Sequence, residues 1–309
     1  YEEKIISENI PLLKEISDEI SCRVKVQYEK NPYPRWVKNG IPTKAKLISE
    51  ICNDLKLDLK SENIKKVTNP SILIAGCGTG QHSIATASRF SNCQVTAFDL
   101  SIASLSYAKR KTIELGITNL EYLQADILNL NQLENKFDII ESVGVLHHMN
   151  NPTEGWKILS NLLKPGGLIK IGLYSKLARK HIVEIRKEIK LLKLGTTEDE
   201  IREFRKFLVK SYNKNHLLIN NSIDFFSLSM FRDLVFHVQE HLYTLPMIQN
   251  CLNELGLKFC GFENKNIVSN FIQFYGNDVN IYDLSLWHKF EKQNPNAFYG
   301  MYNFWCQKL

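Results

Sequence analysis

Short apolar runs alternate with helix-like stretches along the middle of this chain. Five runs have the length and apolar content of buried strands: 71–75, 93–99, 121–127, 137–140 and 163–172. Residues 84–90, between the first two runs, are predicted to be helical. Strands that alternate with helices favour an α/β fold with a doubly wound, mostly parallel sheet.

The C-terminal part of the sequence continues this alternation. Residues 245–256 form an amphipathic pattern that ends at Gly256, a residue typical of helix C-termini. A strand at 257–263, a helix at 282–293 and a last strand at 297–308 follow. We therefore expect seven strands.

Residues 175–221 interrupt the alternation. Ile182, Ile185, Ile189 and Leu192 recur there at helical spacing, which predicts a helical insert between the fifth and sixth strands. From 157 to 215 there are fifteen Lys and Arg against six Asp and Glu, a local excess of +9 in a chain of net charge +6. This charge favours an acidic substrate, a phosphorylated carrier or nucleic acid, but a solvated helical face also explains it. Because repeated base-stacking aromatic residues are missing, a nucleic-acid partner is not expected.

Three alternating glycines follow the first predicted strand. At Gly76, Gly78 and Gly80 a turn without side chains lets the backbone approach a ligand closely. A dinucleotide loop has the spacing G-x-G-x-x-G, whereas the spacing here is G-x-G-x-G, which disfavours NAD. Asp99, at the end of the next strand, has the place of an acid that accepts hydrogen bonds from a ribose.

With these residues, the stretch from 71 to 172 resembles class I S-adenosylmethionine-dependent methyltransferases. The Ala-Asp pair at Asp126, the stretch 141–149 and the Pro-Gly-Gly turn before the fifth strand match further landmarks of that family, in order. The resemblance implies a Rossmann-like fold with an antiparallel last strand, S-adenosylmethionine as methyl donor and S-adenosylhomocysteine as product. It also implies a set of cofactor-binding residues: Gly76, Cys77, Gly78, Gly80, Asp99, Leu100, Asp126, Ile127 and Ser142.

Some polar residues of this stretch have plainer explanations. Asp126 has a second possible role, because an Asp at a strand end also caps the following helix. Asp138 is expected to be structural. His147 and His148 titrate near neutrality, but the family often carries such histidines without using them as bases, so we do not assign them to catalysis.

A stiff segment precedes this core at 26–36. Pro32 and Pro34 hold it extended, and it resembles a segment of bacterial methyltransferases that are often fused behind tetratricopeptide repeats, Gln-Tyr-Glu-x-Asn-Pro-Tyr-Pro-Arg-Trp. The resemblance implies that Arg35 or Tyr28 meets the methionine carboxylate of the cofactor or lines the substrate entrance. Alternatively, Trp36 and its neighbours cover the edge of the sheet.

Residues 224–244 carry more polar groups than a connector needs. If 231–241 is helical, Asp233, His237 and either Glu240 or His241 share a face. A histidine beside a carboxylate suits removal of a proton from an oxygen or nitrogen acceptor, so His237 is the first candidate base and His241 the second. These groups have an alternative role as partners for one another between insert and core. A metal site is not predicted, because a third committed ligand is missing.

These patterns divide the chain into four segments. We expect an N-terminal helical strap at 1–65, a cofactor-binding core at 66–174, a helical cap at 175–240 and the completion of the core at 241–309. The chain opens at Tyr1 without a methionine and with a polar, helix-like run to Ser21, so we expect a part upstream of it in the full-length protein. The resemblance of the 26–36 segment implies that this part is a tetratricopeptide-repeat region.

Composition limits the remaining classes. The 309 residues are 44% hydrophobic, enough for a full core, and their apolar stretches are too short for a transmembrane helix. The seven cysteines form no C-x-x-C pair, which favours free thiols and a cytoplasmic location. We expect a methyltransferase that acts on an oxygen or nitrogen of a protein side chain or small molecule. The alternative is a non-catalytic binding or interaction module on the same fold.

Overall fold

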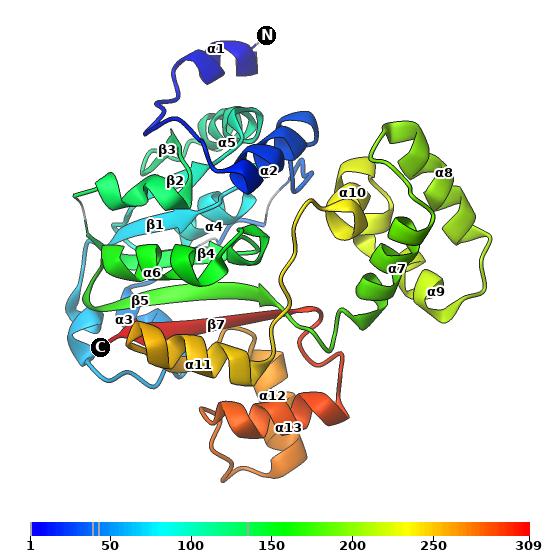
Figure 1. Cartoon of the computed structure of the whole chain (residues 1–309). Helices are drawn as coiled ribbons and strands as arrows, with labels where there is room; N and C mark the ends of the chain where they lie inside the picture. The colour runs from blue at the N-terminus through cyan, green and yellow to red at the C-terminus, as the bar shows by residue number, and fades with distance from the viewer. Residues whose placement is uncertain (1, 39, 43, 135) are drawn as a thin grey trace.

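A seven-stranded sheet forms the centre of the molecule (Figure 1), in the order β3-β2-β1-β4-β5-β7-β6. The structure is a computed structural model that describes residues 2–38, 40–42, 44–134 and 136–309, so Tyr1 lies outside the described residues. The strands are β1 (Ser71–Ala75), β2 (Gln94–Asp99), β3 (Leu120–Gln124), β4 (Phe137–Val143), β5 (Leu163–Tyr174), β6 (Leu257–Phe262) and β7 (Met301–Lys308). Strand β7 pairs antiparallel with β5 and β6, and the other pairs are parallel. The predicted seven-stranded, Rossmann-like arrangement is confirmed.

Helices cover both faces of this sheet. Alternate residues of β1 divide between two cores, because successive side chains of a strand point to opposite faces. Ile72 and Ile74 pack with α3 (Ile48–Asp54), α4 (Gln81–Arg89) and α5 (Ile102–Glu114). Leu73 packs in the other core, which four helices cover: α6 (Pro152–Leu162), α11 (Leu245–Leu255), α12 (Lys265–Tyr275) and α13 (Leu284–Gln293).

The strand order fixes where a ligand site is expected. Strand β1 lies between β2 and β4, and the chain continues to opposite sides of it. In an open α/β sheet, the crevice outside the carboxyl ends of such strands is the usual binding position.

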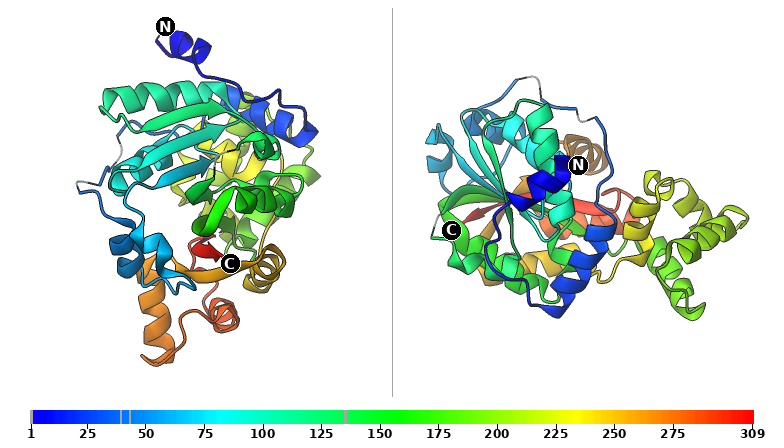
Figure 2. Two further views of the ribbon diagram at one scale, coloured as in Figure 1. Left: turned by 90° about the vertical axis from the view of Figure 1, so that its left-hand side faces the viewer. Right: turned by 90° about the horizontal axis from the view of Figure 1, so that it is seen from above.

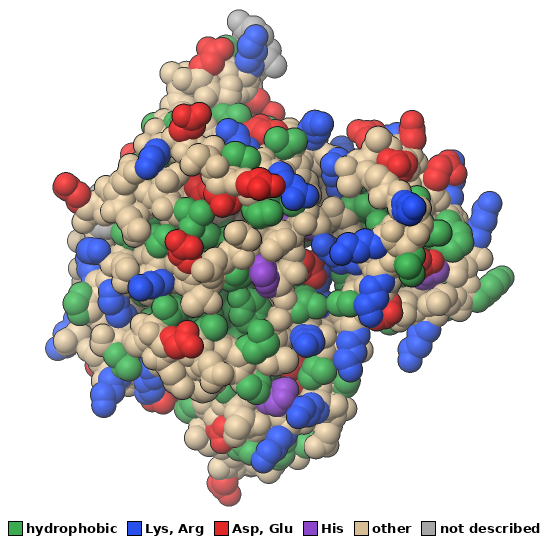
Figure 3. All heavy atoms as spheres, viewed as in Figure 1, with side chains coloured by type: hydrophobic (Ala, Val, Ile, Leu, Met, Phe, Trp, Pro, Cys, Tyr) green, Lys and Arg blue, Asp and Glu red, His purple; other side chains and the backbone are tan. Residues whose placement is uncertain are grey.

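Four helices between β5 and α11 form a separate lobe (Figures 1 and 2). They are α7 (Lys180–Leu191), α8 (Glu198–Val209), α9 (Lys214–Asn220) and α10 (Leu228–Phe236). The lobe has its own buried cluster, to which Ile182, Ile185 and Ile189 contribute as their spacing predicted. Lys and Arg side chains gather where the lobe meets the body (Figure 3). The domain boundaries given above remain predictions.

The N-terminal segment differs from the predicted helical run to Ser21. Helix α1 (Glu2–Glu8) ends before Pro11, and α2 (Glu19–Lys30) begins after the cap Asp18, whose side chain accepts from the backbone N–H of Ser21. Between the helices, Leu12 forms a parallel bridge with Gln124 of β3. The edge of the sheet therefore holds the linker in an extended conformation.

Other boundaries of helices and strands also differ from those predicted from the sequence. Strand β3 ends at Gln124 and β7 begins at Met301, so both strands are shorter than predicted. The sequence patterns did not predict α12. No helix in the described part of the chain combines the length and apolar character that a bilayer crossing needs.

Candidate active site

A cavity of about 680 Å³ opens at the carboxyl ends of β1, β2 and β4. This volume is in the range of small-molecule sites. Seven of the residues predicted to bind a cofactor line it: Gly76, Cys77, Gly78, Asp99, Leu100, Asp126 and Ile127. Gly80, Ser142, Arg35, His237 and His241 do not belong to the described lining.

The glycine loop leaves no room for side chains. Gly76 and Gly78 have positive φ angles of 74° and 51°. A Cβ atom at Gly76 would lie 2.4 Å from Cγ2 of Val145, and one at Gly78 would lie 2.4 Å from the carbonyl oxygen of Tyr33. Val145 and Tyr33 both line the cavity, so Gly76 and Gly78 allow the backbone of the loop to pack directly against the cavity wall.

Gly80 has a different role from the predicted cofactor contact. It caps α4 with φ 86°, and a Cβ atom there would lie 2.6 Å from Cβ of Ala108. This glycine therefore allows close packing of α4 against α5.

Asp99 ends β2 at the floor of the cavity. Its Oδ2 accepts a hydrogen bond from the backbone N–H of Gly78 at 2.8 Å, and its Oδ1 accepts one from Ser101 at 2.9 Å. Burial raises the pKa of Asp99, while these backbone N–H groups act in the opposite direction. Each oxygen keeps capacity for one further hydrogen bond, which a ribose hydroxyl can donate.

Asp126 caps the following helix and also lines the cavity. Its Oδ1 accepts from the backbone N–H of Leu128 at 3.0 Å and caps the short 3₁₀ helix Ile127–Gln132. Its carboxylate also interacts with the side chain of Ser21, another residue of the cavity lining, and the role of Asp126 as a cofactor-binding residue stays a prediction.

Ser142 is wrongly predicted as a lining residue. It lies within β4 with 0% of its surface exposed, and the lining continues instead with Val143, Gly144 and Val145.

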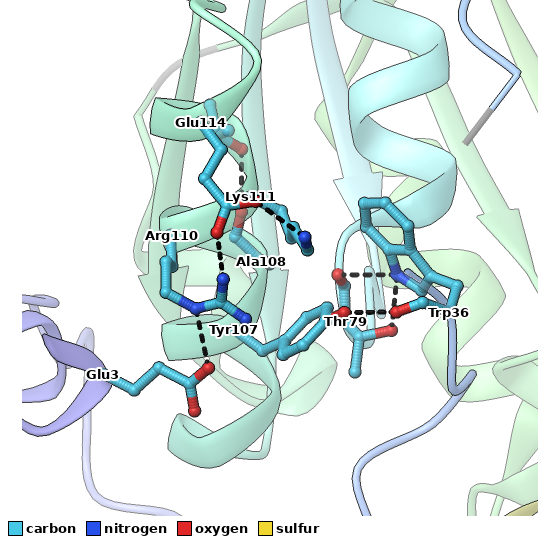
Figure 4. A network of polar contacts seen from close by, with 9 residues as sticks. Glu3, Trp36, Thr79, Tyr107, Ala108, Arg110, Lys111 and Glu114 are labelled. Atoms are coloured by element: carbon cyan, nitrogen blue, oxygen red, sulfur yellow. Dashed lines mark hydrogen bonds and ion pairs between the residues drawn. The ribbon is translucent and has the colours of Figure 1, made fainter. Parts of the chain in front are cut away.

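The segment after α2 lies directly on the glycine loop (Figure 4). The backbone N–H of Thr79 donates to the carbonyl oxygen of Tyr33 at 3.1 Å, and its hydroxyl donates to that of Pro34 at 2.6 Å. The indole N–H of Trp36 donates to the Thr79 hydroxyl at 3.1 Å. Trp36 thus has the packing role, and Tyr33 lines the cavity.

Arg35 does not have the predicted position. Its side chain is exposed, outside the cavity lining, because Trp36 occupies the inward position of this segment. Tyr28, the other residue proposed for this role, does line the cavity.

A second group of polar side chains borders the cavity where α2 and α10 meet, and we call this part the acceptor end. The hydroxyl of Tyr28, on α2, donates to Oδ1 of Asp233, on α10, at 2.7 Å, and lies 3.1 Å from Nε2 of His237. The backbone N–H of Gln239 donates to Nδ1 of His237 at 3.2 Å. The neutral His237 ring therefore carries its proton on Nε2 and donates it to Tyr28, so neither nitrogen faces the cavity.

This arrangement differs from the predicted helix 231–241. Helix α10 ends at Phe236, where His237 takes an extended conformation with ψ 141°. Asp233 and His237 meet through Tyr28 rather than by sharing a helix face. His241 lies behind the wall, where its Nε2 is 3.1 Å from the side-chain amide of Gln239.

Burial sets the protonation of this group. It raises the pKa of Asp233 to about 7 and lowers the pKa of His237 well below its usual range. His148 lines the cavity and stacks on His237 with ring centroids 3.6 Å apart. Its Nδ1 donates to the carbonyl oxygen of Gln239 at 2.6 Å, and burial lowers its pKa to about 3.

A third polar group lies on the α4 side of the cavity and was not predicted. His82 and Lys170 line the cavity, His82 pairs with the fully buried Glu141, and Lys170 lies 3.3 Å from Glu263. The sequence signal that marks this group is a charged residue within each of two apolar strands, Glu141 in β4 and Lys170 in β5. Among the described residues, no group of three or more His, Cys, Asp and Glu side chains is placed to hold a metal ion.

Comparison with known proteins identifies the class of the central segment. Residues 72–167 match a family described as a methyltransferase domain. The chain is 29% identical over 209 residues to an uncharacterized protein of Synechococcus sp., covering 64% of this chain and 49% of that protein. It is 31% identical over 177 residues to malonyl-[acyl-carrier protein] O-methyltransferase 1 of Ilyobacter polytropus, covering 55% and 61%. A ubiquinone biosynthesis O-methyltransferase of Leptothrix cholodnii is 28% identical over 151 residues, covering 47% and 63%.

The solved structures agree on the fold. PKMT2 from Rickettsia typhi, in complex with AdoHcy, superposes with a TM-score of 0.60 at 15% identity, covering 88% of this chain and 54% of that chain. The chain spans 49 to 63% of the length of the three relatives named above. Residues 72–167 therefore match a methyltransferase domain, and they lie within a Rossmann-like sheet.

Proposed function

We propose that this protein is an S-adenosylmethionine-dependent methyltransferase that acts on an oxygen or nitrogen acceptor. One observation carries the proposal. Within the segment that matches a methyltransferase domain, the loop after β1, the end of β2 and the end of β3 bring three cavity-lining groups together at a single strand edge: Gly76 and Gly78, Asp99, and Asp126.

The donor end of the cavity has the groups that this cofactor needs. Asp99 offers one acceptor position on each oxygen for the ribose, and Asp126 with Ile127 lies at the next strand end for the adenine. The glycine loop, with Cys77 and Leu100 beside it, leaves backbone within reach of the methionine part. Positive-φ glycines whose Cβ atoms would meet the cavity wall are the structural sign of such a close approach.

The chain positions the acceptor, excludes water from the cavity and supplies a group that accepts a proton. When bound, the cofactor supplies a methyl group on a positively charged sulfur. Residues of the wall hold the acceptor in line with that group and exclude water, which makes proximity the main source of rate. Asp233, whose pKa is near neutrality, accepts the acceptor's proton. His237 positions Tyr28, and through it Asp233, rather than acting as the base itself, and His241 supports the same wall.

The acceptor is not carried over from the relatives. Their names give different acceptors, and the acceptor end is built mostly from segments outside 72–167. A protein side chain and a small molecule both remain in the proposal. The Gln27–Trp36 segment also supports an upstream tetratricopeptide-repeat region and a place among the methyltransferases associated with such repeats. A cytoplasmic location stays a prediction.

A non-catalytic module is the less favoured alternative. A non-catalytic module leaves unexplained why Asp233, a carboxylate with a pKa near neutrality, lines the same cavity as the donor groups. Isothermal titration of the chain with S-adenosylhomocysteine and, separately, with NAD tests the class. We expect binding of the first only, followed by transfer of labelled methyl groups to an acceptor pool. Binding of NAD alone, or of neither compound, contradicts the proposal.

A further inference from the structure

We propose that the acceptor is an amine, which binds in its ammonium form against Asp233 and gives this carboxylate its proton. The inference rests on the methyl transfer proposed above and names the substrate class of the same site. It follows from the charges and rings that line the acceptor end.

The charge of the lining favours a cation. Among the described lining residues, the acids are Asp99, Asp126, Asp233 and Glu263, and Lys170 is the one Lys or Arg. Lys170 pairs with Glu263, while Asp99 and Asp126 lie at the nucleoside end. The acceptor end is thus left with the carboxylate of Asp233.

The nearby arginines are paired with a different carboxylate, although the charge of Arg179 also lowers the pKa of Asp233. Arg179 donates to both oxygens of Glu240, at 3.2 and 2.9 Å, and Arg186 lies 3.6 Å from the same carboxylate. Arg186 also donates to the carbonyl oxygen of His237. Neither belongs to the lining, so an acceptor that carries a carboxylate or phosphate meets Asp233 without a cation to hold it.

Aromatic rings complete the cation site. Tyr28 and Tyr33 line the cavity beside Asp233, and after burial the charge of Asp233 is the next cause that raises the pKa of each tyrosine. The faces of such rings attract ammonium groups. Tyr174 also lines this end, but its ring already stacks on His147 and holds the guanidinium of Arg179.

Asp233 has a free position for the proton. Its Oδ1 accepts from Tyr28, and no hydrogen bond reaches Oδ2 from the described residues. The ammonium gives its proton to Oδ2, and the freed nitrogen lone pair forms the bond to the methyl carbon. The electrons of the broken carbon–sulfur bond stay on sulfur, and Asp233 later releases the proton to solvent. The positive charge passes from sulfur to nitrogen, so the product is the N-methylated amine in its ammonium form.

Three probes of matched length test the inference. The chain is saturated with S-adenosylhomocysteine, and n-hexylamine, n-hexanol and hexanoate are titrated by ligand-observed NMR. We expect hexylamine to bind at least about 10-fold more tightly than the other two, because it alone pairs with Asp233. Asp233→Asn keeps the acceptor for Tyr28 and should lose this preference. Asp199→Asn removes an exposed acid of the same lobe outside the lining and should keep the preference. Tyr33→Leu should weaken the binding of hexylamine alone.

The outcomes separate the two proposals. Equal binding of hexylamine and hexanol, preference for hexanoate, no binding of any probe, or an unchanged preference in Asp233→Asn overturns the amine assignment. In each of these cases, binding of S-adenosylhomocysteine still supports the proposed methyl transfer. A wild-type chain that does not bind S-adenosylhomocysteine overturns the proposed function itself.

Discussion

The two ends of one cavity are built in different ways. At the donor end, Asp99 and Asp126 accept hydrogen bonds from backbone N–H groups of their own or adjacent loops. At the acceptor end, Tyr28 meets Asp233 and His237, which are 205 and 209 residues away in sequence. The first end depends on local turns of one segment, and the second on how the strap and the helical lobe pack. The donor site is therefore set by the fold itself, whereas the acceptor site can differ between proteins that share the fold.

The strongest test of this division removes the charge at the acceptor end. Asp233→Asn should lower kcat by at least about 100-fold, because a general base in contact with the acceptor is lost. Affinity for S-adenosylhomocysteine should stay within about twofold, as measured by titration. Asp199→Asn, an exposed acid of the same lobe, serves as the matched control. If Asp233→Asn also lost affinity for S-adenosylhomocysteine, the two ends of the cavity would not be independent sites.

Sequence patterns were informative to different degrees at the two ends. Gly76, Gly78 and Asp99 were singled out because their spacing along consecutive strands repeats a local geometry, and Asp126 was singled out by the family resemblance. Asp233 and Tyr28 both belong to segments singled out for excess polarity, but their contact is tertiary, and no spacing rule gives it.

The errors have the same origin. The helix expected at 231–241 ends at Phe236, because the chain turns there to bring His237 to Tyr28. Arg35 was placed inward by resemblance, whereas the packing of Trp36 on Thr79 turns it to solvent. Periodicity gave α11 and β6 well, since both bury one regular face, but it missed α12.

A smaller test concerns the contact between the strap and the donor loop. Gly78→Ala should raise the Kd for S-adenosylhomocysteine by about 10-fold and cost at least about 2 kcal/mol of unfolding free energy, because the new Cβ meets Tyr33 at positive φ. Gly116 also has positive φ, with nothing within 4 Å of a Cβ. Gly116→Ala should cost only about 1 kcal/mol and leave Kd unchanged. Equal losses of unfolding free energy in Gly78→Ala and Gly116→Ala, measured by chemical unfolding, would contradict the role of the strap.

His237 offers a test of positioning against catalysis. His237→Gln should lower kcat about 10-fold by loosening Tyr28, with donor affinity unchanged. The pH–rate profile should still rise through about pH 7, since it reports ionisation of Asp233. A profile that loses this rise would make His237 the base.

The smallest expected effect is on stability. The folded pKa of Asp233, about 7, lies above its unfolded value near 3.9, so the folded state binds more protons between these values. The wild type should therefore lose stability relative to Asp233→Asn as pH rises from about 4 to 8, and the difference should level off above the folded pKa. Thermal unfolding at several pH values measures this, and a constant difference in Tm would contradict the assigned burial of the charge.

The most direct measurement is a calorimetric titration of S-adenosylhomocysteine into the wild type, Asp99→Ala and the surface control Asp54→Ala. Asp99 holds the glycine loop through Gly78 and faces the cavity. The account predicts binding by the wild type and by Asp54→Ala, and a Kd at least about 100-fold higher for Asp99→Ala. Equal binding by all three proteins would contradict the assignment of the donor site.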